Sequence, residues 1–103
     1  MTITPEFSSN IETIAGYVFN GCTVLESITI PSTVEYIGGY AFDDCDSLHS
    51  IYCKPTTPLQ LDNRYTFDGA SDLRIYVPTA SLKLYQGAEH WEAYYDILEA
   101  YAF

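Results

Sequence analysis

Three cysteines are the most reactive side chains of this sequence. Cys22 and Cys45 lie 23 residues apart, at equivalent positions of two similar segments. If these segments stack at the spacing of paired strands, the two Cα atoms lie about 5 Å apart, which a disulfide tolerates. The parallel Cα–Cβ directions would strain that bond, so we expect buried, reduced thiols in a stacked column. An odd number of cysteines also excludes a complete set of internal disulfides.

Other groups that could do chemistry lack the partners that their chemistry requires. The run Asp43-Asp44-x-Asp46 offers oxygen ligands for calcium, but it has neither the spacing nor the glycine and terminal glutamate of an EF-hand. His49 and His90 have no partner set, and no Cys-x-x-Cys or Gly-x-Ser-x-Gly motif occurs. We therefore predict a non-enzymatic protein with no catalytic residue, no metal site and no cofactor. The acidic run is expected to be a solvated turn.

Composition excludes several further classes of protein. The 103 residues suit one domain, and 48% apolar with 17% charged residues are typical of a folded chain. A formal charge of -10 argues against nucleic-acid binding, which relies on basic patches. No apolar run approaches the roughly 20 residues of a membrane span. The start Met-Thr-Ile-Thr-Pro has no secretory signal, which predicts a cytoplasmic protein or a piece of a longer secreted one.

An internal repeat organises the chain. A segment at 25–47 aligns without gaps, at a spacing of 23, with an atypical first copy at 1–24. A third, longer copy at 48–72 runs through Pro55 and Pro58, and residues 73–103 hold a last strand and a C-terminal cap. The second copy reads Leu-x-x-Ile-x-Ile-Pro, and a period of 20–29 residues with such spacing is typical of leucine-rich repeats.

The repeat predicts which side chains face inward. Ile28 and Ile30 share one face of a short strand, and Pro31 ends it. Cys53 takes the place of Ile30 in the third copy and is expected to be a small core residue. Single repeats cannot bury such residues, but stacked repeats can. We predict a β-rich α/β repeat fold: a short solenoid of about three 23-residue coils, each with a bend or one-turn helix at its Gly-Tyr-Ala-Phe segment and a tight turn at Gly38-Gly39, closed by a helical, aromatic cap.

The second copy also resembles a known family. Residues 28–45 carry every position of the pattern Ile-x-Ile-Pro-x-x-Val-x-x-Ile-Gly-x-x-Ala-Phe-x-x-Cys. This pattern closely resembles the BspA-like leucine-rich repeats of bacterial surface antigens, and the segment 73–91 resembles their usual C-terminal end. The resemblance implies a cell-surface or secreted protein that adheres to host proteins or to other cells.

The two ends of the chain give different expectations. At the C-terminal end, Thr79 or Ser81 is expected to cap a helix that stops near Gly87. Its apolar stripe comprises Leu82, Leu84, Tyr85 and Ala88, and a flap or second short helix follows with Trp91, Tyr94, Tyr95, Ile97 and Leu98. The N-terminal end is poorly protected, since only Pro5 and Glu6 discourage pairing at its edge. Apolar residues expected at its exposed face suggest further upstream repeats or self-association: Ile3, Phe7, Ile11 and Ile14.

The outward positions of the predicted strands form a candidate binding strip. If alternate residues point inward, one outward column holds Thr29, Tyr52 and Tyr76, and the next holds Ser27, Ser50 and Arg74. His49 and Lys54 lie beside these columns. Tyrosine and arginine are enriched at binding hot spots, so this strip is our candidate site for an unidentified protein partner. The alternatives are that the tyrosine pair only stabilises the sheet, and that the chain is a structural spacer or cap of a longer repeat protein.

Overall fold

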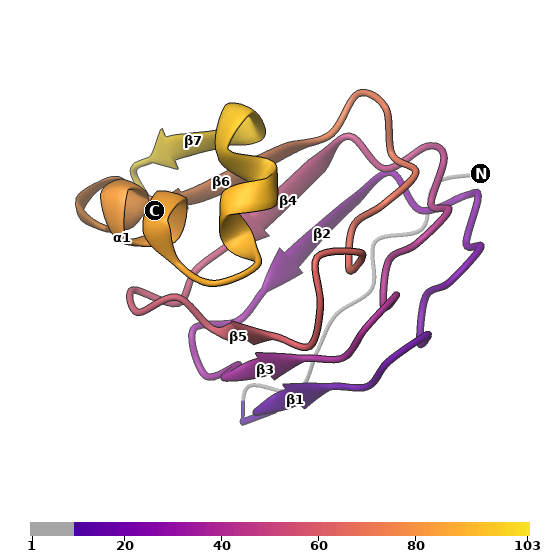
Figure 1. The fold of residues 1–103 in the computed structure, drawn as a ribbon, viewed down its shortest axis with the longest axis horizontal. Coiled ribbons are helices and arrows are strands. Elements are labelled where there is room, and N and C mark those ends of the chain that lie inside the picture. The colour runs from indigo at the N-terminus through magenta and orange to yellow at the C-terminus, as the bar shows by residue number, and fades with distance from the viewer. Residues whose placement is uncertain (1–9) are drawn as a thin grey trace.

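The computed structural model describes residues 10–103, and its strands form two parallel sheets with the core between them (Figure 1). The first sheet has the order β2-β4-β6-β7 and the second the order β1-β3-β5. The bounds in the first sheet are β2 Ser27–Ile30, β4 Ser50–Cys53, β6 Arg74–Pro78 and β7 Leu98–Tyr101. Those in the second are β1 Thr13–Ile14, β3 Tyr36–Ile37 and β5 Gln60–Leu61. Parallel-strand sheets with few helices make this an α/β repeat fold.

Strand pairing follows the repeat alignment. Ile14 pairs with Ile37 in the second sheet, and Ile28 pairs with Ile51 in the first, both at the predicted spacing of 23. Ile51 then pairs with Ile75, one residue later, because the third copy is longer. The residues predicted to point inward are fully buried, including Ile30, Cys53 and Val77.

The segments that join the sheets are also paired from repeat to repeat. The Phe19 amide donates to the Ala41 carbonyl (2.8 Å), and the Phe42 amide donates to the Thr66 carbonyl (2.9 Å). These segments are hydrogen-bonded turns, so the bend predicted at Gly-Tyr-Ala-Phe is confirmed and the one-turn helix is not. The rings of Phe19, Phe42 and Phe67 stack through the core, with centroids 5.2 and 5.6 Å apart.

Gly38 serves close packing of neighbouring repeats, which differs from the tight turn expected at Gly38-Gly39. A Cβ atom on Gly38 would lie 2.2 Å from the backbone nitrogen of Gly16 in the preceding repeat. The left-handed conformation falls on the tyrosines instead, with φ of 62° at Tyr17 and 60° at Tyr40. The sequence correctly indicates that the structure needs glycine at position 38. The physical reason is that the backbones of two neighbouring repeats approach too closely for a side chain.

The C-terminal cap departs from the prediction in three ways. Neither Thr79 nor Ser81 caps a helix through its side chain: η1 spans Thr79–Ser81, and the Ser81 hydroxyl donates to the Thr56 carbonyl (2.6 Å). The helix α1, Leu82–Gly87, ends where predicted, but Leu84 is 59% exposed and lies off the apolar stripe. Leu98 belongs to β7, so β6 is not the last strand of the sheet.

The remaining cap residues close the core. The second short helix exists as the 3-10 helix η2, Trp91–Ile97. Trp91 is fully buried, and its indole N–H donates to the Leu59 carbonyl (2.8 Å). Tyr85 is also fully buried, and its hydroxyl donates to the Pro55 carbonyl (2.6 Å). Both aromatic residues therefore tie the cap to the long loop of the third repeat.

Part of the predicted N-terminal edge lies outside the described residues, namely Ile3, Pro5, Glu6 and Phe7. Of the two isoleucines inside them, Ile11 is half-buried and Ile14 is 2% exposed, so the predicted exposure of Ile14 is wrong. Over residues 10–103, no helix has the length and apolar character needed to cross a membrane.

We predict that Gly38→Ala destabilises the fold by about 1–3 kcal/mol, because its methyl group would overlap the backbone at Gly16. Gly87→Ala is the matched control, since a Cβ there meets no atom within 4 Å. The control should change the free energy of unfolding by less than about 1 kcal/mol. Urea denaturation measures both. Equal stability of the two variants would contradict the proposed close packing.

Candidate binding surface

The outward columns predicted for the first sheet are present. Thr29 pairs with Tyr52, and Tyr52 pairs with Tyr76, so these side chains lie in one row across β2, β4 and β6. Ser27, Ser50 and Arg74 form the neighbouring row by the same register. The alternate residues are buried, so both rows face away from the core. The structure therefore places the predicted residues on one sheet face.

Aromatic rings gather at the centre of this face. Tyr52 and Tyr76 stack with centroids 5.1 Å apart and an interplanar angle of 15°. Tyr101 packs edge-on against both rings, at 5.4 and 5.6 Å. Phe103 lies 4.8 Å from Tyr101 and is half exposed. These four residues, Tyr52, Tyr76, Tyr101 and Phe103, are called the outer aromatic cluster below.

Two members of this cluster, Tyr101 and Phe103, are not among the binding residues predicted from the sequence. Tyr101 reaches the cluster because β7 pairs in parallel with β6, whereas the sequence places residues 98–103 in the C-terminal cap. A signal was present: Leu98 follows Ile75 by 23 residues, which is the spacing of the first two repeats and the register in which β7 pairs with β6. The intervening helices had obscured this last repetition.

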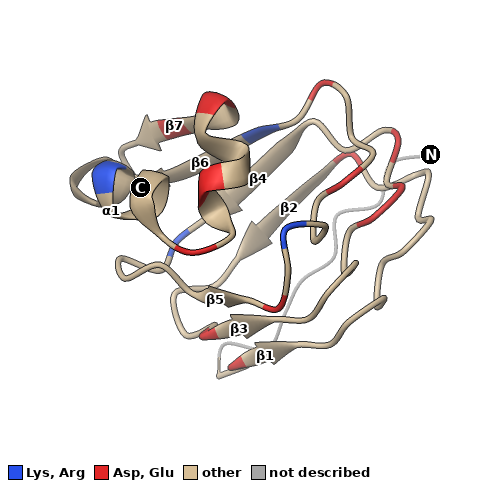
Figure 2. Ribbon diagram, viewed as in Figure 1, with Lys and Arg blue, Asp and Glu red and all other residues tan. Residues whose placement is uncertain are grey.

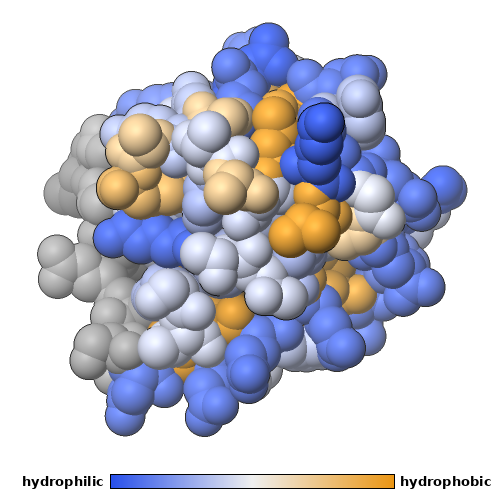
Figure 3. Space-filling model, turned by 90° about the vertical axis from the view of Figure 1, so that its left-hand side faces the viewer, coloured by the Kyte–Doolittle hydropathy of each residue, from blue (hydrophilic) through white to orange (hydrophobic). Residues whose placement is uncertain are grey.

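Two shallow hollows adjoin the cluster. One, of about 260 Å³, is lined by Thr29, Tyr52, Lys54, Tyr101 and Phe103. The other, of about 550 Å³, continues past Lys54 and Phe103 toward Pro78 and Thr79. On the side of the molecule where α1 and the C-terminus lie, apolar patches are interspersed with hydrophilic ones (Figure 3). The hollows thus combine aromatic surface with the ammonium group of Lys54.

The basic members of the predicted site lie at opposite ends of the strands, on either side of the stacked tyrosines. Lys54 follows the end of β4 and lies with Thr29, Tyr52 and Tyr101. His49 precedes β4, and its backbone carbonyl accepts a hydrogen bond from the Arg74 amide (3.0 Å). His49 and Arg74 therefore lie together at the opposite end.

The basic side chains at that opposite end have partners within the chain. The Arg74 guanidinium lies 3.5 Å from the Glu99 carboxylate and also donates to the Asp96 carbonyl. His49 Nδ1 is hydrogen-bonded to the Ser50 hydroxyl (2.9 Å), and Nε2 lies 3.9 Å from Glu26. Among the described residues, the cationic side chain that lines the hollows beside the aromatic rings is Lys54.

The three cysteines are free thiols, as expected. Cys45 and Cys53 are buried, whereas Cys22 is half-buried, so the predicted burial is incomplete. The Cys45 thiol donates to the Phe19 carbonyl (3.1 Å), and burial raises its pKa to about 11. Burial raises the pKa of Cys53 to about 12. Both buried thiols are therefore protonated and unreactive near neutral pH.

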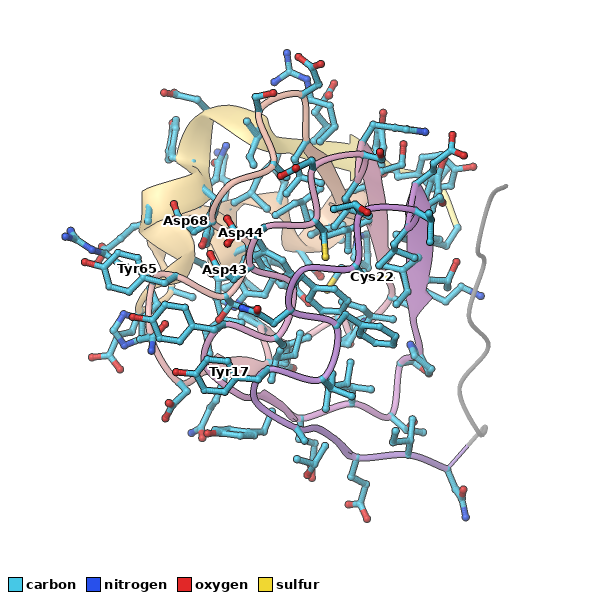
Figure 4. The ribbon with its side chains drawn as sticks, turned by 90° about the vertical axis from the view of Figure 1, so that its right-hand side faces the viewer. Tyr17, Cys22, Asp43, Asp44, Tyr65 and Asp68 are labelled. Carbon is cyan, nitrogen blue, oxygen red and sulfur yellow. The ribbon has the colours of Figure 1, made fainter. Side chains whose placement is uncertain are left out.

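The acidic turn is held by neighbouring repeats. The Asn20 side chain donates to the Asp43 carboxylate (3.3 Å), and Asp43, Asp44 and Asp68 lie close together in Figure 4. Desolvation, followed by the charges of Asp44 and Asp68, raises the pKa of Asp43. In the part of the chain that the structure describes, no group of three or more His, Cys, Asp or Glu side chains has an arrangement that could hold a metal ion.

Comparison with known proteins identifies the repeat. A family model described as "BspA type Leucine rich repeat region (6 copies)" matches residues 2–87. A search of curated proteins finds no match.

We predict that iodoacetamide at pH 7.5 modifies Cys22 faster than Cys45 and Cys53. The raised pKa values of the buried pair keep them protonated, and burial excludes the reagent. In 8 M urea, all three should react at similar rates, because each then behaves as an ordinary thiol. Mass spectrometry of the labelled peptides gives the rates. Labelling of Cys53 as fast as Cys22 in the folded protein would contradict the described core.

Proposed function

Because the chain belongs to the BspA-type leucine-rich repeat family, we propose that it is a non-enzymatic protein-binding or adhesion module of a bacterial surface or secreted protein. In this proposal, residues 1–103 form one repeat domain. It is a short solenoid of about three 23-residue coils with a C-terminal cap. The partner is a protein on a host or bacterial surface.

The outer aromatic cluster is the observation that carries this proposal. Four aromatic side chains contact one another on the outward face of the first sheet. Tyr101 is 42% exposed and Phe103 is 50% exposed, so the cluster offers apolar area to a partner. Aromatic rings of this kind supply contact area at a low cost in side-chain entropy. The contacts between the rings restrict them further before any partner binds.

Polar groups around the cluster would orient a partner. Lys54 lines both hollows beside the rings, and Thr29 lines one of them. An aromatic centre with a polar rim is the usual anatomy of a protein interface. Lys54 lies on a strongly acidic chain, and it would favour a carboxylate of the partner at this position.

The second candidate function is a structural spacer or C-terminal cap of a longer repeat protein, without a ligand of its own. It is supported by the stacking of Tyr52 on Tyr76, since cross-strand aromatic pairs stabilise sheets by roughly 0.2–1 kcal/mol. In this role the outer aromatic cluster would protect the end of the first sheet, and neighbouring domains would bind the partner.

Self-association through the N-terminal edge remains a separate proposal. Within the described residues, β1 is an edge strand of the second sheet, and it spans only Thr13–Ile14. Short edge strands discourage pairing with another chain. Sedimentation of the protein at high concentration tests this proposal, and a monomer there would contradict it.

We predict that the double substitution Tyr52→Ala and Tyr76→Ala weakens partner capture at least tenfold, because it removes the stacked centre of the outer aromatic cluster. The free energy of unfolding should fall by about 1 kcal/mol or less, since both rings lie on the sheet surface. Capture is measured against a fixed panel of purified host extracellular proteins and against intact bacterial cells. Thermal denaturation of the same samples reports stability.

The control is Tyr95→Ala, which removes a ring that is 55% exposed on η2, outside the outer aromatic cluster. This variant should bind as the wild type does. Unchanged capture by the double variant together with a large loss of stability would favour the spacer. A wild-type chain that captures no member of the panel would also count against the binding module.

A further inference from the structure

The second sheet presents its own outward row of side chains, separate from the binding strip predicted on the first sheet. Thr13 pairs with Tyr36, and Tyr36 pairs with Gln60, so these three side chains lie across β1, β3 and β5. Their neighbours Ile14, Ile37 and Leu61 are buried in the core. Tyr36 is therefore the central outward side chain of this sheet.

Three hollows meet at Tyr36 and form a groove along this face. The first, about 560 Å³, lies against the loop from Pro55 to Pro58. The second, about 380 Å³, extends toward residues 88–90. The third, about 300 Å³, reaches Tyr17 and Tyr40 and has Gly38 and Gly39 at its base. All three hollows are lined in part by Tyr36, so they adjoin one another at the centre of this sheet face.

The lining of the groove is acidic. Glu35, Asp62 and Glu89 line its three hollows, and no Lys or Arg is found among the described lining residues. The basic group in the lining is His90, whose Nε2 lies 3.9 Å from the Glu89 carboxylate in the second hollow. Tyr36 and Asp62 line two of the hollows together, and desolvation followed by the nearby Asp62 carboxylate raises the pKa of Tyr36. Figure 2 shows the acidic residues next to β1, β3 and β5. The groove therefore offers negative charge along its length, which favours a cationic occupant.

An aromatic ladder adjoins the third hollow. Tyr17 stacks on Tyr40 at 5.2 Å, and Tyr40 stacks on Tyr65 at 5.7 Å. Figure 4 shows the labelled Tyr17 and Tyr65 projecting outward from the turn segments. The ladder already holds one cation of the chain, because the Arg64 guanidinium lies 5.2 Å from the Tyr65 ring centroid. Tyr17 at its other end is 63% exposed and lines the hollow with Asp62.

We propose that this groove on the β1–β3–β5 face binds a basic, extended polypeptide segment of a partner protein. One Lys or Arg side chain enters the third hollow, where the Asp62 carboxylate and the rings of Tyr17 and Tyr40 surround its charge. Cations gain both from a carboxylate and from aromatic rings within about 6 Å. This surface belongs to a different sheet from the outer aromatic cluster, so the two proposals are independent.

The test uses a ten-residue peptide of alternating lysine and serine, with a glutamate–serine peptide as the charge-reversed control. Isothermal titration calorimetry at 50 mM salt measures the Kd for each variant. Asp62→Asn should weaken binding of the lysine peptide at least fivefold. Asp72→Asn removes the same charge from an exposed loop position outside the groove and should change the Kd less than twofold. The glutamate peptide should not bind.

A second pair of variants tests the aromatic contribution. Tyr17→Leu should weaken binding of the lysine peptide about threefold or more, whereas Tyr17→Phe retains the ring and should bind within twofold of the wild type. The far-ultraviolet circular dichroism spectrum confirms folding of each variant, and the exposure of Tyr17 makes unfolding unexpected.

Three outcomes would overturn the proposal. Equal losses of affinity for the lysine peptide in Asp62→Asn and Asp72→Asn would mean that the peptide is attracted only to the net charge of -10 and not to the groove. Wild-type binding by Tyr17→Leu would exclude the third hollow as the cation site, and absence of lysine-peptide binding would exclude the groove. Tyr52→Ala with Tyr76→Ala should leave peptide binding unchanged, so failure here is distinguishable from failure of the adhesion proposal.

Discussion

Hydrogen bonds between the backbones of consecutive repeats keep equivalent residues about one strand spacing apart, roughly 4.8 Å. They occur in both sheets and also in the turns between them, where the Gly21 amide donates to the Asp43 carbonyl and the Asp44 amide donates to the Asp68 carbonyl. Side chains at equivalent positions therefore stack on one another at a similar spacing. Equivalent rings stack at 5.1–5.7 Å in the core, on the first sheet and on the turns. One constraint thus creates the core and both surfaces for which binding is proposed.

This constraint explains which parts of the fold could be predicted. Two repeats that align without gaps fix the pairing register, and the register fixes which side chains face inward. The burial of Ile28, Ile30 and Cys53 and the pairing of Tyr52 with Tyr76 follow directly. The helical segments of the C-terminal cap have no second copy with which to be aligned. Local signals alone predict this region incorrectly: the Ser81 hydroxyl binds a distant carbonyl, and the strand Leu98–Tyr101 follows three helical segments.

The same reasoning explains why the outward column of the first sheet could be predicted from the sequence and the groove of the second sheet could not. Tyr52 and Tyr76 occupy equivalent positions, so their column could be identified from the sequence. Tyr36 has Thr13 and Gln60 at its equivalent positions, so repetition gives no sign of a shared surface there. The groove at Tyr36 depends on loops of different lengths, including the one through Pro55 and Pro58, whose paths follow from tertiary packing.

The left-handed backbone at Tyr17 and Tyr40 has a consequence for how this sequence could vary. Glycine adopts φ near 60° without the steric cost that a side chain adds, so glycine at either position would relax the backbone. Keeping tyrosine therefore costs about 1–2 kcal/mol of backbone strain at each position. Ring contacts of about 0.5–1.5 kcal/mol each oppose this cost, one at Tyr17 and two at Tyr40. At these two positions, a residue that favours the backbone conformation of the turn would lack the aromatic ring that tyrosine places on its surface. A change to glycine at either position would relieve the backbone strain, but it would also erase the ladder one ring at a time.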